Sequence, residues 1–518
     1  MEQSAAASPD KIIEDIGGCG RFQIRMGITV HATKTFISFS IMSMILISAT
    51  PPWWCVSEVT YSNMTSCINS PNNTLHCQEK ACYLNGTKCK RFQFEGSART
   101  IVSEFELLCG LDYIPSTVMS MQIFGMLTGA LLAGQISDLF GRKPPYFAGL
   151  VCLMVFNLIG FVSVNWIMFA ISRLFIGIGA GAFLAIQYCI VSEFSLARWR
   201  AWITGFPSWP LQSCLFALVA WLIQDWRYIQ LFCCLLGLPC LLTWFIVPES
   251  FRWYIAHDRI EDASRVIGRV ARFNKRPVPD IKNIGITKET TRESKKYTFI
   301  HLFKSKSLAK TTIMLSINWF ALGLVFYGIS FGIQALAGNI YLNLFLFNLV
   351  AIPAKLITVW VTNKLGRRGS AIICFTTVAI SGFVVGIVQA VDAPKRDTLT
   401  NVFAIIANMA INMAWGPIQT MTIEVYPTVI RNIGFGSLSV IARVGAVLGP
   451  QFVYLNAYVP GLLFFVCGGI AVLCILSQLF LPETRNLNLN DKLHQAEAEV
   501  VSLEDKIQDV NGEMKIVN

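Results

Sequence analysis

Charged residues are scarce in this sequence, and so are the motifs that usually carry catalysis. Asp, Glu, Lys and Arg make up only 14% of the 518 residues, whereas apolar residues make up 54%. The sequence has no G-x-x-x-x-G-K-[ST] phosphate loop and no H-E-x-x-H zinc motif, and its five histidines are scattered. These absences argue against an ATP-driven pump and a membrane hydrolase. We predict a protein that is not an enzyme and that needs no metal or cofactor.

A cleavable signal peptide is also missing. About 20 mostly polar residues precede the first apolar run, and no short apolar core with a small-residue cleavage site stands before it. We therefore expect the first span to be a retained signal-anchor that follows a cytosolic segment, residues 1–23.

Long apolar runs are what the sequence has instead. About 20 apolar residues cross a hydrocarbon core of roughly 30 Å. We predict an all-α membrane protein with twelve transmembrane helices in two six-helix bundles, and a bilayer as its surroundings. The bundles cover 24–248 and 310–481, with a polar loop at 249–309 between them and a tail at 482–518. The expected spans are 24–50, 113–136, 145–164, 167–191, 201–223, 229–248, 310–331, 337–362, 370–390, 399–423, 432–453 and 460–481.

The net charge of +11 does not indicate a nucleic-acid partner, because Lys and Arg fall in particular loops between the spans. These loops, which include 249–309, all have the same parity, and the positive-inside rule makes them cytosolic. Both termini are then cytosolic and the loop 51–112 is extracellular.

The loop 51–112 carries further evidence for that orientation. It holds three N-x-Thr glycosylation sequons, at Asn63, Asn72 and Asn85. Six cysteines lie in or beside it, and their spacing lacks the CxxC pattern of a zinc site, so we predict disulfides. The sequence leaves all fifteen pairings open. The cysteines are Cys55, Cys67, Cys77, Cys82, Cys89 and Cys109.

Four cations lie within the expected spans: Lys34, Arg173, Lys355 and Arg443. No Asp or Glu lies inside any of the twelve, and a lone cation near the bilayer centre costs on the order of 2.5–3.5 kcal/mol. Cations without acidic partners indicate a water-filled cavity that accepts an anion. The alternative is that each cation donates to helix carbonyls in a packed interface, which we favour for Lys34 and Arg173.

A cavity for organic anions also needs apolar walls, and several aromatic residues stand beside helix-breaking residues in the expected spans. Trp209 lies between two prolines, Phe326 and Tyr327 precede a glycine, and Trp415 precedes Gly-Pro. Flat apolar walls suit the body of an organic molecule. The alternative for any one of these rings is lipid contact or core packing.

A polar break recurs in the two halves. Gly134-Gln-Ile-Ser-Asp-Leu-Phe-Gly-Arg-Lys143 separates two apolar spans in the first half, and Asn363-Lys-Leu-Gly-Arg-Arg368 does so in the second. This repeated motif predicts that the chain consists of two related halves. We expect the first copy to be a hinge at the cytosolic face rather than a ligand site.

Together these motifs resemble the major facilitator superfamily, and within it the organic cation, anion and zwitterion transporter family. The similarity covers about 20–485. Besides the first polar break, the matching segments are Ser172–Gly177, Glu193–Arg200, Pro248–Trp253, Glu424–Arg431 and Leu481–Thr484. Ile352–Leu356 and Ala442–Gly445, which contain Lys355 and Arg443, are most similar to the organic anion branch.

The resemblance implies a secondary transporter of organic anions in the plasma membrane. It implies a central site between the bundles, alternating access, and exchange for an intracellular counter-ion such as a dicarboxylate. The substrate-binding residues would be Lys355, Arg443, Trp209, Phe326, Tyr327, Trp415 and Lys34. The gating residues would be Asp138, Gly141, Arg142, Glu193, Arg200, Glu424 and Arg431.

Two other hypotheses stay open. In the nearer one the chain is a zwitterion, carnitine-like or organic cation carrier. The other, of a different class, is a non-transporting receptor or scaffold with a facilitator fold. Lys355 is the better discriminator within the family, because carnitine-type members usually lack that lysine.

Overall fold

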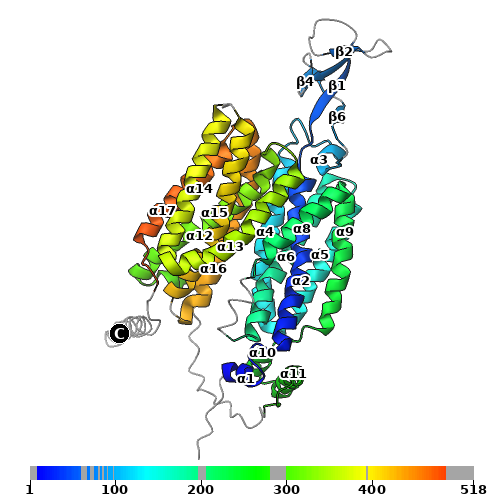
Figure 1. Ribbon diagram of the computed structural model, residues 1–518. Helices are drawn as coiled ribbons and strands as arrows, with labels where there is room; N and C mark the ends of the chain where they lie inside the picture. The colour runs from blue at the N-terminus through cyan, green and yellow to red at the C-terminus, as the bar shows by residue number, and fades with distance from the viewer. Residues whose placement is uncertain are drawn as a thin grey trace, which may run out of the picture. The chain divides into compact units, whose positions relative to one another are not determined.

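The computed structural model describes residues 9–59, 67–69, 75–79, 82–84, 87–89, 91–96, 98–196, 206–279, 299–391, 395–426 and 428–485. Within this part of the chain, eleven helices are long and apolar enough to cross a membrane (Figure 1). The twelfth expected span, 201–223, is described from Ser208 onward as a shorter apolar helix. The order of apolar helices is therefore the one that the sequence predicts.

The helices begin and end close to the expected bounds. The spanning helices are α2 (Arg21–Ile47), α4 (Ile114–Phe140), α5 (Lys143–Phe161), α6 (Trp166–Glu193), α8 (Ser208–Ile223), α9 (Trp226–Leu242, continued by η1, Thr243–Phe245), α12 (Lys306–Gly332), α13 (Ile340–Leu365), α14 (Arg367–Ala390), α15 (Arg396–Val425), α16 (Thr428–Tyr458) and α17 (Leu462–Phe480). Short polar caps set several of these starts. Asn165 accepts a hydrogen bond from the Met168 amide at the start of α6, and Asp225 accepts from the Arg227 amide at the start of α9.

The chain divides into two compact units that do not coincide with its two halves. Unit 1 contains 1–291 together with 330–352 and 447–460, and unit 2 contains 292–329, 353–446 and 461–518. Three long helices, α12, α13 and α16, therefore contribute to both units. The expected bundle boundaries, 24–248 and 310–481, stay a prediction.

Unit 1 packs α4 tightly against α6 through small residues. A Cβ added at Gly177 would lie 2.0 Å from the Gln122 carbonyl oxygen, and one added at Gly129 would lie 2.0 Å from the Ile178 carbonyl oxygen. Only glycine allows helix backbones to approach so closely, as is common in membrane proteins.

The segment after α2 contains strands that the sequence did not predict. β1 (Trp53–Val59) pairs antiparallel with β3 (Leu75–Glu79) and β6 (Phe92–Phe94), and β2 (Cys67–Asn69) extends the sheet beyond β3. A separate hairpin joins β4 (Tyr83–Leu84) and β5 (Thr87–Lys88). Figure 1 shows this β-rich segment beyond one end of the unit 1 helices.

Two disulfides cross-link this part of the chain, one within the β-rich segment and one to the turn that precedes α4. They join Cys55 to Cys89 and Cys82 to Cys109, which settles two of the pairs that the sequence left open. The register also places Cys67 opposite Cys77, whose pairing stays a prediction. In Figure 1 the short helix α3 (Ile101–Glu104) lies between the strands and the helices of unit 1.

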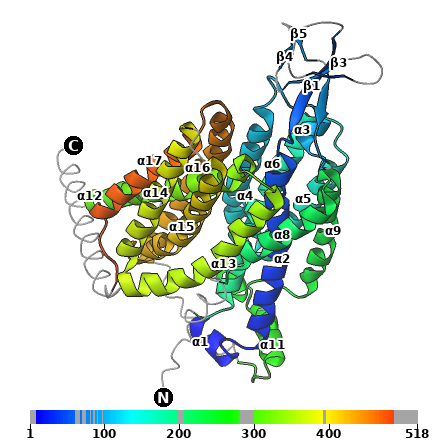
Figure 2. The same cartoon turned by 45° about the horizontal axis from the view of Figure 1, so that its top comes forward.

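Short helices gather at the opposite end of unit 1. These are α1 (Pro9–Asp15), α10 (Phe251–Ala256) and α11 (Ile260–Phe273). Apolar residues recur at roughly helical spacing in the loop 249–309 and predict short amphipathic helices there, where α10 and α11 lie, whereas α1 was not predicted. In unit 2 a 3-10 helix, η2 (Phe299–Phe303), precedes α12, and η3 (Ile333–Ala335) follows α12 in unit 1. Both ribbon views place α1 and α11 at the N-terminal end of α2 (Figure 2).

Candidate functional site

Two of the predicted cations, Lys355 and Arg443, lie in unit 2. Arg443, half-buried on α16, donates from Nη1 to the Ser439 side-chain oxygen at 2.6 Å and to the Ser439 carbonyl oxygen at 3.2 Å. Lys355, on α13, is also half-buried. Among the described residues, no carboxylate lies within 4.0 Å of either cation. Two cations in apolar spans therefore keep an uncompensated positive charge.

Aromatic rings line the same part of unit 2. The ring centres of Phe326 and Tyr327 on α12 lie 5.2 Å apart, and Phe326 lies 6.3 Å from Trp415 on α15. Behind them, the buried Trp319 meets Trp415 edge-on at 5.9 Å and donates from its indole nitrogen to the Thr422 hydroxyl at 2.9 Å. Edge-to-face contacts of this kind hold aromatic rings in fixed orientations. Three predicted aromatics thus form one connected group.

Close helix packing brings the cations to these rings. A Cβ at Gly445 would lie 2.2 Å from the Phe320 carbonyl oxygen, so α16, which carries Arg443, lies directly against α12, which carries Tyr327. A Cβ at Gly416 would lie 2.7 Å from the Thr358 methyl carbon, so α15 meets α13 beside Trp415. Thr358 is three residues after Lys355 and shares its helix face. The structure therefore assembles Lys355, Arg443 and three aromatics in one unit.

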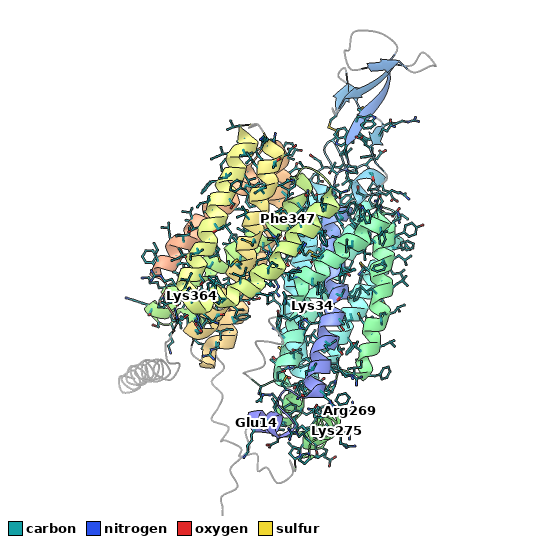
Figure 3. The ribbon with its side chains drawn as sticks, viewed as in Figure 1. Glu14, Lys34, Arg269, Lys275, Phe347 and Lys364 are labelled. Carbon is teal, nitrogen blue, oxygen red and sulfur yellow. A yellow bond between two sulfur atoms is a disulfide. The ribbon has the colours of Figure 1, made fainter. Side chains whose placement is uncertain are left out.

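Lys34 and Trp209 come together in unit 1. The Lys34 ammonium lies 5.7 Å from the centre of the Trp209 ring and 3.4 Å from the Ser208 hydroxyl (Figure 3 labels Lys34 on α2). His31, one turn earlier on α2, places Nδ1 3.0 Å from the same hydroxyl, and its carbonyl oxygen accepts a hydrogen bond from Gln212. A cation over an indole face is a favourable pair. The sequence predicted Lys34 and Trp209 but not His31 or Ser208.

Arg173 occupies a packed interface. It is fully buried, and one guanidinium nitrogen donates to the Ser40 carbonyl oxygen and the Ser43 hydroxyl at 3.0 Å and to the Gln122 side-chain oxygen at 3.4 Å. Its guanidinium also lies 4.8 Å from the centre of the Phe169 ring. These contacts fit the packed-interface interpretation, so we do not place Arg173 in the binding site.

The first polar break forms a clamped loop. Gly141 ends α4 with φ of +98°, and Arg142 then pairs with Asp138 at 2.6 Å and with Glu193 at 3.3 Å. Burial alone would lower the pKa of the Arg142 guanidinium, but the hydrogen bonds and charges of Asp138 and Glu193 raise it above its ordinary value. The Glu249 carboxylate accepts from the backbone amides of Arg142 at 2.7 Å and Lys143 at 3.0 Å.

The second polar break has the same backbone clamp. Gly366 has φ of +84°, and the Glu483 carboxylate accepts from the amides of Arg367 at 2.9 Å and Arg368 at 3.1 Å. Arg367 binds both carboxylate oxygens of Glu424, at 2.8 and 3.1 Å. Of the other predicted gating residues, Arg431 donates to the Tyr426 carbonyl oxygen at 3.3 Å.

Some predicted residues lie outside the described part of the chain. These are Arg200 among the gating residues and the sequons at Asn63, Asn72 and Asn85. Their roles stay predictions.

The sequence did not single out Glu249 and Glu483, whose carboxylates clamp the two loops. Both belong to segments that carried the family resemblance, but neither was counted among the gating residues. The signal was a repeated Pro-Glu followed by Ser or Thr, once after the sixth expected span and once after the twelfth. Ser439 could also have been found, because it stands four residues before Arg443 on one helix face.

Comparison with known proteins identifies the architecture. The family model described as "Sugar (and other) transporter" matches residues 64–496. A solved structure of the xylose transporter XylE from E. coli, in an inward open conformation, aligns with a TM-score of 0.61 over 90% of this chain and 99% of that one, at 17% identity. The prediction of a major facilitator fold is confirmed.

Three curated relatives are more similar in sequence than this solved structure is. The chain is 27% identical to a Drosophila melanogaster "Organic cation transporter protein" over 94% of both chains. It is 26% identical to Bos taurus "Solute carrier family 22 member 7" over 94% of this chain and 96% of that one. It is 29% identical to human "Organic cation/carnitine transporter 2" over 76% of this chain and 71% of that protein. These names cover cation and carnitine carriers, and they do not single out an anion branch.

Proposed function

The chain belongs to the "Sugar (and other) transporter" family, and we propose that it is a secondary transporter of small organic anions. The observation that carries this proposal is the pair Lys355 and Arg443, two cations in apolar helices of unit 2 with no described carboxylate within 4.0 Å. An anion would supply the missing negative charge.

Each residue has a chemical task in this proposal. The planar guanidinium of Arg443 suits a carboxylate, which it binds through two parallel hydrogen bonds, and Ser439 orients it from one turn away. Lys355 adds a second, less directional charge. Phe326, Tyr327 and Trp415 supply flat walls for an apolar or aromatic body. Substrates with one carboxylate and one ring fit this set of groups.

Gating follows from the clamped loops. Asp138, Arg142 and Glu193 hold the ends of α4, α5 and α6 together, and Arg367 with Glu424 holds the start of α14 to the end of α15. Alternating access requires such ends to move as rigid groups. Because the sequence has no ATP site, uphill movement would use exchange, with an intracellular dicarboxylate as the counter-ion.

The same proposal includes an orientation. The plasma membrane would hold the protein with both termini in the cytosol, so the β-rich segment 51–112, with its sequons, lies outside. The Lys- and Arg-rich loops support this direction.

A zwitterion carrier is the second candidate, and the name of the human relative favours it. In a carnitine-like mode, Arg443 would hold the carboxylate and the aromatic rings would receive the cationic end. The two candidates differ over Lys355, since a positive charge beside the substrate helps a pure anion and opposes a quaternary ammonium group.

Uptake by cells that express single variants tests the proposal. Arg443→Ala should raise KM for a labelled aromatic carboxylate by about 30-fold or more, because removing one partner of a desolvated charge pair costs on the order of 2–5 kcal/mol. Lys355→Ala should weaken anion uptake and leave or improve carnitine uptake. Lys364→Ala is the matched control, since Lys364 lies in the last turn of the same helix, over the Trp360 ring.

Three results would redirect the proposal. Unchanged anion uptake by both variants overturns the anion site. The zwitterion carrier is selected if the unmodified protein moves carnitine but no anion, and if carnitine uptake is lost in Arg443→Ala and kept in Lys355→Ala. No saturable flux of anion, cation or zwitterion in reconstituted vesicles favours the receptor or scaffold. Preloading with a dicarboxylate should speed anion uptake if exchange is the mechanism.

A further inference from the structure

The helix α11 is anchored to the start of α2. Its buried side contains Ala263, Ile267, Val270 and Ala271, all fully buried. Just after the helix, the Asn274 side chain donates to the Ile16 carbonyl oxygen at 2.8 Å and accepts from the Phe22 amide at 2.8 Å. The C-terminal end of α11 is thus fixed at the first turn of a membrane-spanning helix.

Six exposed cations surround this junction. We call them the basic rim: Arg21, Arg25, Arg269, Arg272, Lys275 and Arg276. No described carboxylate lies within 4.0 Å of any of the six. Two further arginines of this region, Arg259 and Arg265, both pair with Asp262, at 2.6 and 3.1 Å. Figure 3 shows Arg269 and Lys275 together at this end of unit 1.

The basic rim lies at the level of the helix starts. Arg269 is near enough to Lys143, the first residue of α5, for their like charges to repel each other, and the Lys143 ammonium lies 4.3 Å from the Trp244 ring centre. The Arg25 guanidinium lies 5.3 Å from the ring centre of Phe273, which is 41% exposed. Cations interleaved with exposed aromatic rings are typical of the membrane–water interface.

Lys275 holds its charge in a backbone conformation that normally selects glycine. Its φ is +56°, and the Arg276 amide donates to the Ala271 carbonyl oxygen at 2.9 Å while the Lys275 amide donates to Arg272 at 3.1 Å. This is a Schellman motif, in which the left-handed position is usually Gly because a side chain there is strained. A lysine at that position adds to the cluster of charge.

We propose that the basic rim binds the headgroup of an anionic phospholipid. The proposal rests on the membrane orientation given above, which places this end of unit 1 at the cytosolic leaflet. A guanidinium group can bind two phosphate oxygens through two parallel hydrogen bonds, and clustered Lys and Arg next to a span attract anionic lipids. Phe273 and the exposed Ile24 and Ile28 lie where the lipid's acyl chains begin.

Titration of the full-length protein in neutral detergent tests this site. Short-chain phosphatidylserine should raise the thermal unfolding midpoint, whereas short-chain phosphatidylcholine and inorganic phosphate at equal concentration should raise it much less. Arg269→Gln/Lys275→Gln should weaken phosphatidylserine binding about tenfold or more. The matched control, Arg259→Gln/Arg265→Gln, removes the same charge from the same region and should bind almost as the unmodified protein does.

Lys275→Gly separates lipid binding from helix stability. It removes strain and charge together, so the unfolding midpoint without lipid should rise while the lipid-induced shift falls. Equal stabilisation by phosphatidylcholine, an equal effect of phosphate alone, or equal loss in both double variants would each overturn the proposal. None of these outcomes depends on transport, so they leave the proposed function untouched.

Discussion

Each unit contains a tight loop between two helices, at Gly141 in unit 1 and at Gly366 in unit 2, and the two loops agree in backbone but differ in side chains. In both, a glutamate from more than a hundred residues later accepts two consecutive amides. In the first, Arg142 divides its bonds between Asp138 and Glu193, whereas in the second Arg367 gives both to Glu424.

The difference shows which part of the loop each unit needs. The backbone clamp recurs because a positive-φ glycine followed by exposed amides requires an acceptor in either unit. The side-chain pairing has diverged, since Asn363 stands where Asp138 would be, and Thr484 donates to Glu424 instead. We infer that the clamp maintains structure and that the pairing tunes motion.

Replacing the glycines should have the largest effect. Gly141→Ala and Gly366→Ala should each lower stability by about 2–3 kcal/mol, because their backbone angles suit only glycine. A Cβ would also lie 2.4 Å from the Glu249 carboxylate or 2.6 Å from that of Glu483. Thermal unfolding in detergent measures this. Gly134→Ala, inside α4 where the space is open, should not lower stability and should raise it slightly, because alanine favours a helix more than glycine does. If only one of the two substitutions lowers stability strongly, the two loops do not share the same backbone requirement.

Acid should weaken the second clamp. Burial alone would raise the pKa of Glu483, but hydrogen bonds from the amides of Arg485, Arg367, Arg368 and Thr484 outweigh it and lower the pKa below its ordinary value. Stability from this group is therefore full above the unfolded pKa, about 4.3, and is lost as pH falls through the folded pKa.

Glu483→Gln measures that contribution. The substitution should lower the free energy of unfolding by roughly 1–2 kcal/mol at neutral pH. When the pH is lowered from about 6 to about 3, the unfolding midpoint of this variant should fall less than that of the unmodified protein, because the variant has no carboxylate to protonate. Parallel acid curves for the two proteins would show that the carboxylate contributes nothing.

Exchanging the divergent residues should have the smallest effect on stability. The Asp138 side chain is 73% exposed, so Asp138→Asn should cost under about 1 kcal/mol. Its effect should be on the transport rate, with KM little changed. Asn363→Asp creates an acid four residues before Arg367 and should shift the rate as well. A change in KM alone for Asp138→Asn would contradict a gating role.

The sequence predicted the membrane fold well, because long apolar runs directly report burial in lipid. It also drew attention to Lys355 and Arg443, since a charge inside such a run is conspicuous, and their role in binding stays a prediction. It missed α1 and the strands of 51–112, which are short and lack a strong period. It did not assign the clamps to Glu249 and Glu483, because partners more than a hundred residues apart are joined only by the fold.

The burial of Arg173 bears on how the chain is made. Its hydrogen-bond acceptors, Ser40, Ser43 and Gln122, belong to α2 and α4, which are synthesised before α6. A cation leaving the insertion machinery alone would meet hydrocarbon at a cost of about 2.5–3.5 kcal/mol. Here the groups that receive it are already in the bilayer, so the order of synthesis itself lowers the barrier to inserting the fourth span.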